Sequence, residues 1–190
     1  ADILLGKVNP SGKLNVSFPR STGNTPCFYN HFVTDREEPF DQPGTPEEPK
    51  GHYIFDKPEP LWNFGHGKSY TTFDYVDCAL SDTLLAASDT LKVSVMIKNT
   101  GRCDGKEVVQ LYVRDKVSTV ATPIQQLKAF QKVLVKSGES QCVELSLPIA
   151  ELALYNAKME EVVEPGDFEI QIGAASDDIR FKKTITINRK

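Results

Sequence analysis

A spacing of two dominates the chain from about Tyr70 to its end. Apolar residues recur at every second position in five segments, Lys92–Lys98, Val108–Val113, Val143–Leu147, Phe168–Ile172 and Thr184–Ile187. Successive side chains of a strand point to opposite faces of a sheet, so this spacing predicts half-buried antiparallel strands. With Phe73–Leu80 and Leu127–Val135 added, we expect about seven strands.

Short turn signals separate these segments. They are Asn99–Gly101, Lys136–Glu139, Glu164–Asp167 and Ala175–Asp178. About seven strands with short connections, and no sustained helical spacing, predict an all-β fold: an immunoglobulin-like or fibronectin type III-like two-sheet antiparallel sandwich. We assign this sandwich to residues 70–190.

Proline divides the remaining third of the chain. Eight of the 12 prolines lie between Pro19 and Pro60, where acidic residues also cluster. Proline lacks the N–H that a helix interior or a central strand requires, so this stretch predicts an extended arm. We expect a Pro- and acid-rich linker at residues 37–69. Residues 1–36, with a turn at Asn9–Gly12 and a short strand at Leu14–Phe18, cannot form a core alone and are expected to be the end of a missing domain.

Composition excludes two classes of protein. The longest apolar runs, such as Ile3–Leu5 and Val133–Val135, are far shorter than the roughly 18 residues of a membrane helix. With 22 Lys and Arg against 26 Asp and Glu, the chain has a net charge of -4 and no basic block, which argues against a nucleic-acid partner. The first residue is Ala and no secretory signal precedes Asp2, so we expect an excised or processed piece.

Two motifs suggest phosphate or metal binding but do not satisfy its requirements. Gly65–Ser69 ends like a phosphate-binding loop, but Trp62 stands where the first glycine is needed and a β-forming segment follows. Cys27 and His31 have ligand spacing, but His52 and His66 form no second local pair. We therefore predict no cofactor and no metal. The four cysteines Cys27, Cys78, Cys103 and Cys142 are expected to be free thiols, a disulfide among the last three being possible only if the fold brings them together.

Carboxylate doublets are candidates for general acid and base catalysis. They are Glu37–Glu38, Glu47–Glu48, Glu160–Glu161 and Asp177–Asp178. Glycoside hydrolysis needs two carboxyls that flank one bond, one of them desolvated, whereas neighbours on a strand point apart and these doublets sit in polar surroundings. We expect solvated surface groups and predict no catalytic residue in this chain. Asn15–Ser17 fits the N-glycosylation pattern, which matters only in a eukaryotic secretory setting.

An aromatic group precedes the first expected strand. Its members are Trp62, Phe64, Tyr70, Phe73 and Tyr75. Exposed, these rings would form a platform for sugars; buried, they would anchor the arm to the β domain. We favour the anchor, because Gly65 and Gly67 allow the close backbone approach that a packed corner needs.

Several segments together resemble glycoside hydrolase family 3, the β-glucosidase and β-xylosidase family. The end of that family's α/β sandwich domain is similar to Asn9–Leu14, Ser17–Ser21 and Tyr29–His31, and its connecting segment to Pro60–Phe73. Its fibronectin type III-like domain is similar to Gly105–Val113, Gln126–Phe130 and Pro165–Gly173. Trp62 and His66 replace other aromatics of the family, and Ala129 replaces a glycine.

The resemblance implies a retaining enzyme that removes terminal β-linked glucose or xylose, a step of carbohydrate metabolism. In that family the nucleophilic aspartate lies in an N-terminal barrel and the acid/base carboxylate in the α/β sandwich domain. No position here matches either motif, so we expect an inactive C-terminal module that buttresses those two domains, its partners, in a periplasmic or secreted parent. A carbohydrate-binding module that uses Trp62 and a protein-interaction or adhesion domain are the alternatives.

Overall fold

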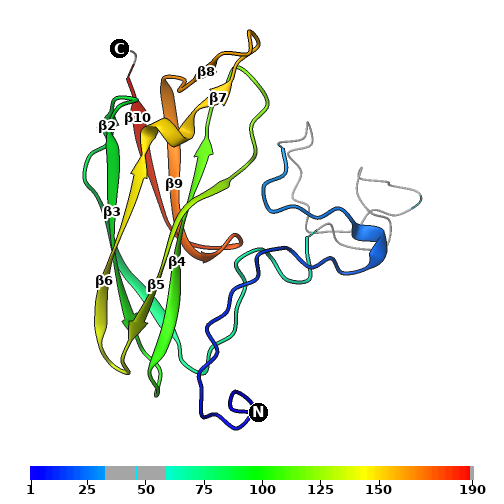
Figure 1. The fold of residues 1–190 in the computed structure, drawn as a ribbon, viewed down its shortest axis with the longest axis vertical. Helices are drawn as coiled ribbons and strands as arrows, with labels where there is room; N and C mark the ends of the chain where they lie inside the picture. Colours follow the sequence, from blue (N-terminus) through cyan, green and yellow to red (C-terminus); the bar gives the residue numbers. More distant parts are fainter. Residues whose placement is uncertain (33–45, 47–58, 189–190) are drawn as a thin grey trace.

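Two sheets pack face to face in the computed structural model, which describes residues 1–32, 46 and 59–188 (Figure 1). The smaller sheet has the order β1-β3-β6, with strands Phe73–Leu80, Thr90–Asn99 and Ser140–Pro148. The larger has the order β2-β10-β9-β4-β5, with strands Leu84–Leu85, Asp178–Ile187, Gly166–Ala175, Gly105–Asp115 and Gln126–Val135. A third pair joins β7 (Leu154–Tyr155) and β8 (Glu161–Val162), and two 3-10 turns, η1 and η2, cover Thr22–Asn24 and Ile149–Leu152.

The core lies between the two main sheets, because the alternate apolar residues of the strands all face inward. Leu91, Val93, Val95 and Ile97 of β3 are all fully buried, and the alternate residues of β4, β6, β9 and β10 complete the same cluster. The predicted sandwich is confirmed, and each of the seven expected strands is present. The sequence missed β2, β7 and β8, because a two-residue strand is too short to show any period.

A bulge in β1 places Tyr75 on the inner face of the sandwich. Tyr75 pairs with Ile97 and Cys78 pairs with Val95, although three positions separate Tyr75 from Cys78 and only two separate their partners. The extra residue leaves Val76 exposed and lets both Tyr75 and Cys78 face the core. Tyr75 thereby reaches the end of the sandwich at which the N-terminal part of the chain docks.

Two extended segments run side by side to this end of the sandwich (Figure 1). We call residues 1–32 the leader and residues 59–72 the approach segment. Leu14 N–H donates to His66 O and Phe18 N–H donates to Trp62 O, both at 2.8 Å. The expected strand at Leu14–Phe18 is therefore a hydrogen-bonded extended segment with a single bridge, Phe18 to Trp62.

The leader also reaches the connection between β4 and β5. Phe32 forms an antiparallel bridge with Pro123, and Ile124 N–H donates to His31 O at 2.9 Å. The domain boundary expected at residue 36 and most of the 37–69 linker lie outside the described residues. Within the described ranges no helix is long and apolar enough to cross a membrane.

Candidate functional site: the junction of leader and sandwich

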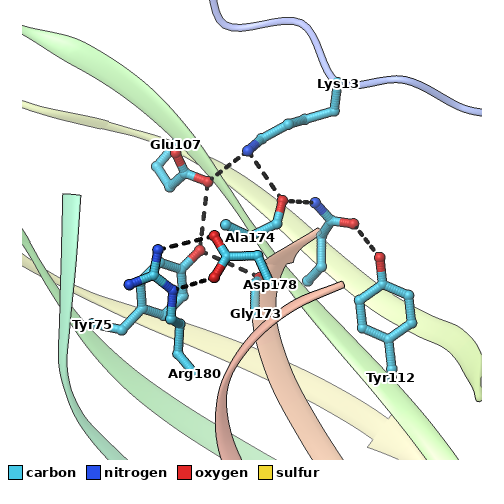
Figure 2. A network of polar contacts seen from close by, with 9 residues as sticks. Lys13, Tyr75, Glu107, Tyr112, Gly173, Ala174, Asp178 and Arg180 are labelled. Atoms are coloured by element: carbon cyan, nitrogen blue, oxygen red, sulfur yellow. Dashed lines mark hydrogen bonds and ion pairs between the residues drawn. The ribbon is translucent and has the colours of Figure 1, made fainter. Parts of the chain in front are cut away.

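A buried ion pair joins the leader to the sandwich (Figure 2). Glu107 lies on β4 and is only 6% exposed. Lys13 Nζ of the leader is 3.0 Å from Glu107 Oε1 and donates to Ala174 O of β9, also at 3.0 Å. A buried carboxylate is costly unless it is paired and hydrogen-bonded, so Lys13 supplies the charge that makes Glu107 tolerable at this position.

Tyr75 contacts the ion pair from the sandwich side. Its hydroxyl donates to Gly173 O at 3.3 Å and lies 3.5 Å from Glu107 Oε1. Burial raises the pKa of Tyr75 far above its ordinary value, and the negative charge of Glu107 raises it further. In its neutral form the phenol of Tyr75 donates a hydrogen bond to Gly173 O.

Arg180 covers the ring of Tyr75. Its guanidinium lies 5.8 Å from the ring centroid and pairs with Asp178, with 2.6 Å between Nε and Oδ1. The hydrogen bond to Asp178 raises the pKa of Arg180. Figure 2 shows these groups converging on one corner, where each charge meets an opposite charge.

A second contact places the approach segment over the outer face of β4. Gln110 Nε2 donates to Ala174 O at 2.5 Å, and Tyr112 OH donates to Gln110 Oε1 at 2.6 Å. Gly65, with φ +83°, lies directly against them: a Cβ there would be 2.5 Å from Gln110 Oε1 and 2.9 Å from Ala175 Cα. Only glycine fits such an approach without displacing the backbone, and this is the role we expected for Gly65.

The five aromatic residues expected to act together have separate places. Phe64 stacks on Tyr29 with 4.1 Å between ring centroids, and Phe73 and Tyr75 pack against the core. Trp62 and Tyr70 are 45% and 52% exposed. Phe64, Phe73 and Tyr75 therefore have the anchoring role, and the five rings do not form one flat platform.

Asn9 ties the two segments to the base of the sandwich. Its Oδ1 accepts hydrogen bonds from Tyr70 N–H at 2.9 Å and Ser69 Oγ at 3.0 Å, and its Nδ2 donates to Asp104 O at 3.0 Å. The sequence interpretation missed Asn9, Lys13 and Glu107 as contact residues. A signal did exist for Glu107, which shares the inward parity of Val109 and Leu111 and therefore required a buried partner.

The doublets expected to be solvated occupy the surface where the structure describes them. Asp177 accepts a hydrogen bond from Asn63 at 2.7 Å, Asp178 pairs with Arg180, and Glu160 accepts one from Asn156 at 2.9 Å. Glu37–Glu38 and Glu47–Glu48 lie outside the described residues. We find no pair of these groups in a shared dry site among the described positions.

The motifs considered for phosphate and metal binding lie in loops. Gly65–Ser69 leads into β1 and not into a helix. Cys27 and His31 both line one cavity between the leader and the sandwich, and His52 is outside the described residues. In the part of the chain that the structure describes, no three His, Cys, Asp or Glu side chains gather in a way that could hold a metal. All four cysteines are free thiols, and burial raises the pKa of Cys78.

Two family models match the chain. Residues 1–70 match the glycosyl hydrolase family 3 C-terminal domain, and residues 107–176 match the fibronectin type III-like domain. The second match falls on strands β4 to β9 of the sandwich.

Individual proteins similar to this chain agree with the two family matches. A β-xylosidase of Formosa agariphila is 41% identical over 100% of this chain and 25% of its own length, and a periplasmic β-glucosidase of Salmonella typhimurium is 38% identical over 95% and 23%. The crystal structure of β-glucosidase from Listeria innocua in complex with glucose superposes with a TM-score of 0.87 at 36% identity, covering 100% of this chain and 26% of that one. The chain thus spans about a quarter of the length of the relatives it matches. It belongs to glycoside hydrolase family 3 and corresponds to the C-terminal portion of that family's proteins, including their fibronectin type III-like domain.

Proposed function

We propose that this chain is the non-catalytic C-terminal module of a β-glucosidase-like enzyme and that it buttresses the catalytic domains. One observation carries the proposal. The leader, which matches the C-terminal domain of family 3, is fastened to the sandwich by the buried Lys13–Glu107 pair. A module built this way holds two parts of an enzyme in a fixed relation.

The carboxylates support a structural role. Among the described residues, Glu107 is the charged side chain that is buried, and Lys13 neutralises it. A retaining glycosidase needs two carboxyls about 5–5.5 Å apart on either side of a sugar bond. Glu107 is only 6% exposed and contacts Lys13 and Tyr75, which supports a structural role for this carboxylate. We assign no catalytic residue, metal or cofactor to this chain.

The parent enzyme would remove terminal β-linked glucose or xylose, as the names of the relatives suggest. Its barrel and α/β sandwich domains would be the partners of this module. A periplasmic or secreted location is supported by the periplasmic β-glucosidase among the relatives.

Hydrolysis of 4-nitrophenyl β-glucoside and β-xyloside tests the assignment. We expect turnover by the full-length parent and none by the 190-residue chain above the buffer rate. Turnover by the chain alone that is lost on substitution of one of its carboxylates would overturn the proposal, and so would a full-length parent that hydrolyses neither compound.

A carbohydrate-binding role is the second candidate, because Trp62 is 45% exposed. Aromatic rings stack on sugar faces, and Trp62 is the single tryptophan of the chain. Titration with cello- and xylo-oligosaccharides, followed by Trp62 fluorescence, separates the two roles. A saturable spectral change would support binding, and an unchanged spectrum at millimolar sugar would eliminate it.

A further inference from the structure

Strand β5 is an edge of the five-stranded sheet and has β4 as its hydrogen-bonded neighbour on one side. It contains 10 residues, which is at the upper end of the usual range of strand lengths. Unpaired N–H and C=O groups along such an edge are a template for another strand. Near its middle, Phe130, Gln131 and Lys132 are all exposed. The middle of β5 is therefore open to a further strand.

The other three edges of the two main sheets are less suited to pairing. β2 has only two residues, and β1 carries the bulge between Tyr75 and Asp77, which bends an edge away from a partner. None of the large apolar side chains that are exposed among the described residues lies on β6. Phe130 and Leu134 of β5, by contrast, are 66% and 53% exposed. β5 is thus the long, regular edge that presents apolar side chains.

The outer face of β5 alternates apolar and basic side chains. With β4 it forms three cross-strand pairs, Gln110–Phe130, Val108–Lys132 and Lys106–Leu134. None of these six residues is acidic. Within the described ranges, no ion pair joins Lys106 or Lys132 to a carboxylate. A partner strand on this edge must therefore accommodate both an unpaired cation and an exposed ring.

The sequence of β5 meets this requirement with a second copy of itself. If Gln131 lies opposite Gln131 of the second copy in an antiparallel pair, Phe130 lies opposite Lys132 and Ala129 lies opposite Val133. Residues directly opposite each other share one face of the sheet and are in side-chain contact. Each Lys132 ammonium then meets the Phe130 ring of the other copy, which is a favourable cation–π contact.

Neighbouring registers bring lysines together instead. In the two registers next to this one that keep both outer faces on one side, Lys132 lies opposite itself or opposite Lys128. Like charges directly opposite each other destabilise a strand pair, which is why lysine on an edge strand usually prevents pairing. Lys128 Nζ already donates to Glu151 O at 2.8 Å, at the end of the free stretch. The charges thus select one register, over Ala129–Val133.

We propose that β5 is a self-association edge, at which two copies of this chain pair their β5 strands antiparallel about Gln131. The contact is isologous, with the same strand on both sides of a two-fold axis, and it joins the two five-stranded sheets into one. It uses neither the leader nor the approach segment. The proposal is therefore independent of the function proposed above.

Disulfide cross-linking tests the register. Directly opposite Cα atoms of an antiparallel pair lie about 4.5–5.5 Å apart, within reach of a disulfide. In a Cys142→Ala background, which removes the exposed native thiol, Gln131→Cys should give a covalent dimer on mild oxidation. Leu134→Cys is the matched control, because its two copies would be six residues apart along the strands, roughly 20 Å. Equal cross-linking by both variants, or none by Q131C, would exclude this register.

Sedimentation equilibrium of the chain tests the side-chain pattern. Phe130→Lys places a lysine opposite Lys132 and should raise the dissociation constant of the dimer by at least about ten-fold. The exchange F130K/K132F again places a cation opposite a ring and should recover most of the affinity. Leu84→Lys is the control, because Leu84 is 55% exposed on β2 at the opposite edge of the same sheet, and it should leave the constant unchanged.

The other outcomes are also decisive. A wild-type chain that stays monomeric up to about 1 mM would contradict the proposal. A dimer that persists in F130K, with circular dichroism showing a folded chain, uses another surface, and β5 is then not the interface. Hydrolysis of 4-nitrophenyl β-glucoside by the full-length parent is scored separately and tests the proposed function alone.

Discussion

Glu107 is a charged exception to the apolar inner pattern of this sandwich. It has the inward parity of Val109, Leu111 and Val113, yet it carries a charge. The counter-charge comes from Lys13 in the leader, so the inner surface of the sandwich is completed by a residue outside the sandwich. At the residue scale, the leader neutralises the one buried carboxylate of the described residues.

We predict unequal costs for removing the two partners. Lys13→Met leaves a carboxylate whose side chain is 8% exposed without its cation, and should lower the free energy of unfolding by about 3 kcal/mol. Glu107→Gln leaves the lysine, which is 19% exposed and can turn toward water, and should cost less. Urea denaturation of each variant gives both values.

The double variant is the control for this pair. Because K13M and E107Q remove the same interaction, their combined cost should be smaller than the sum of the single costs by about 1 kcal/mol or more. Strict additivity would show that the ion pair does not couple the leader to the sandwich.

The raised pKa of Asp115 predicts how the stability of the chain changes with pH. Burial raises its pKa, the hydrogen bond from Val117 N–H opposes this, and nearby Glu164 raises it further. The folded state then binds more protons than the unfolded state, so this group costs stability as the pH rises from about 4 through the folded pKa. Asp115→Asn should therefore stabilise the chain at pH 7 by up to about 0.5 kcal/mol, allowing for solvent screening, and the gain should vanish toward pH 4.

Thermal unfolding at several pH values measures this difference. Asp104→Asn is the matched control, because Asp104 is exposed and also accepts a backbone hydrogen bond, from Ser137 N–H at 2.9 Å. A stability gain for D115N that does not depend on pH would contradict the assignment to Asp115 ionisation.

At the scale of elements, the sandwich could be predicted and the junction could not. The strands follow from a local spacing of two, and the seven long ones extend over eight to eleven residues each. The contacts of Lys13 and Asn9 join positions far apart in the chain, which no local pattern encodes, whereas the close approach at Gly65 was expected from the sequence. Leu14–Phe18 looked like a strand, but its partner segment turns at Gly65 and only the Phe18–Trp62 bridge forms.

Gly65 shows how closely the approach segment packs on β4. Gly65→Ala meets two penalties, a φ of +83° and a Cβ 2.9 Å from Ala175 Cα. We expect a loss of at least about 2 kcal/mol in the free energy of unfolding. Gly138→Ala is the matched control: its φ is +78° with nothing within 4 Å of the added Cβ, so it should cost only about 1 kcal/mol. Equal losses in urea denaturation would show that the contact with Gln110 and Ala175 contributes nothing.

For the whole molecule, leader, approach segment and sandwich form one unit. Lys13, Asn9 and Gly65 attach the first two segments to β4, β9 and the base of the sandwich. The division into residues 1–36, 37–69 and 70–190 stays a prediction, and the contacts argue that a sandwich cut at residue 70 would lose the cation that Glu107 needs. A unit of this kind suits a module that fixes one catalytic domain against another.

Equilibrium unfolding followed by two probes tests this claim most directly. Trp62, the single tryptophan, reports on the approach segment and the leader beside it, and far-ultraviolet circular dichroism reports on the sandwich. If the leader is an integral part of the module, the two urea transitions share one midpoint in the wild-type chain, and K13M lowers both midpoints together. A wild-type Trp62 transition complete before the sandwich begins to unfold would contradict the account.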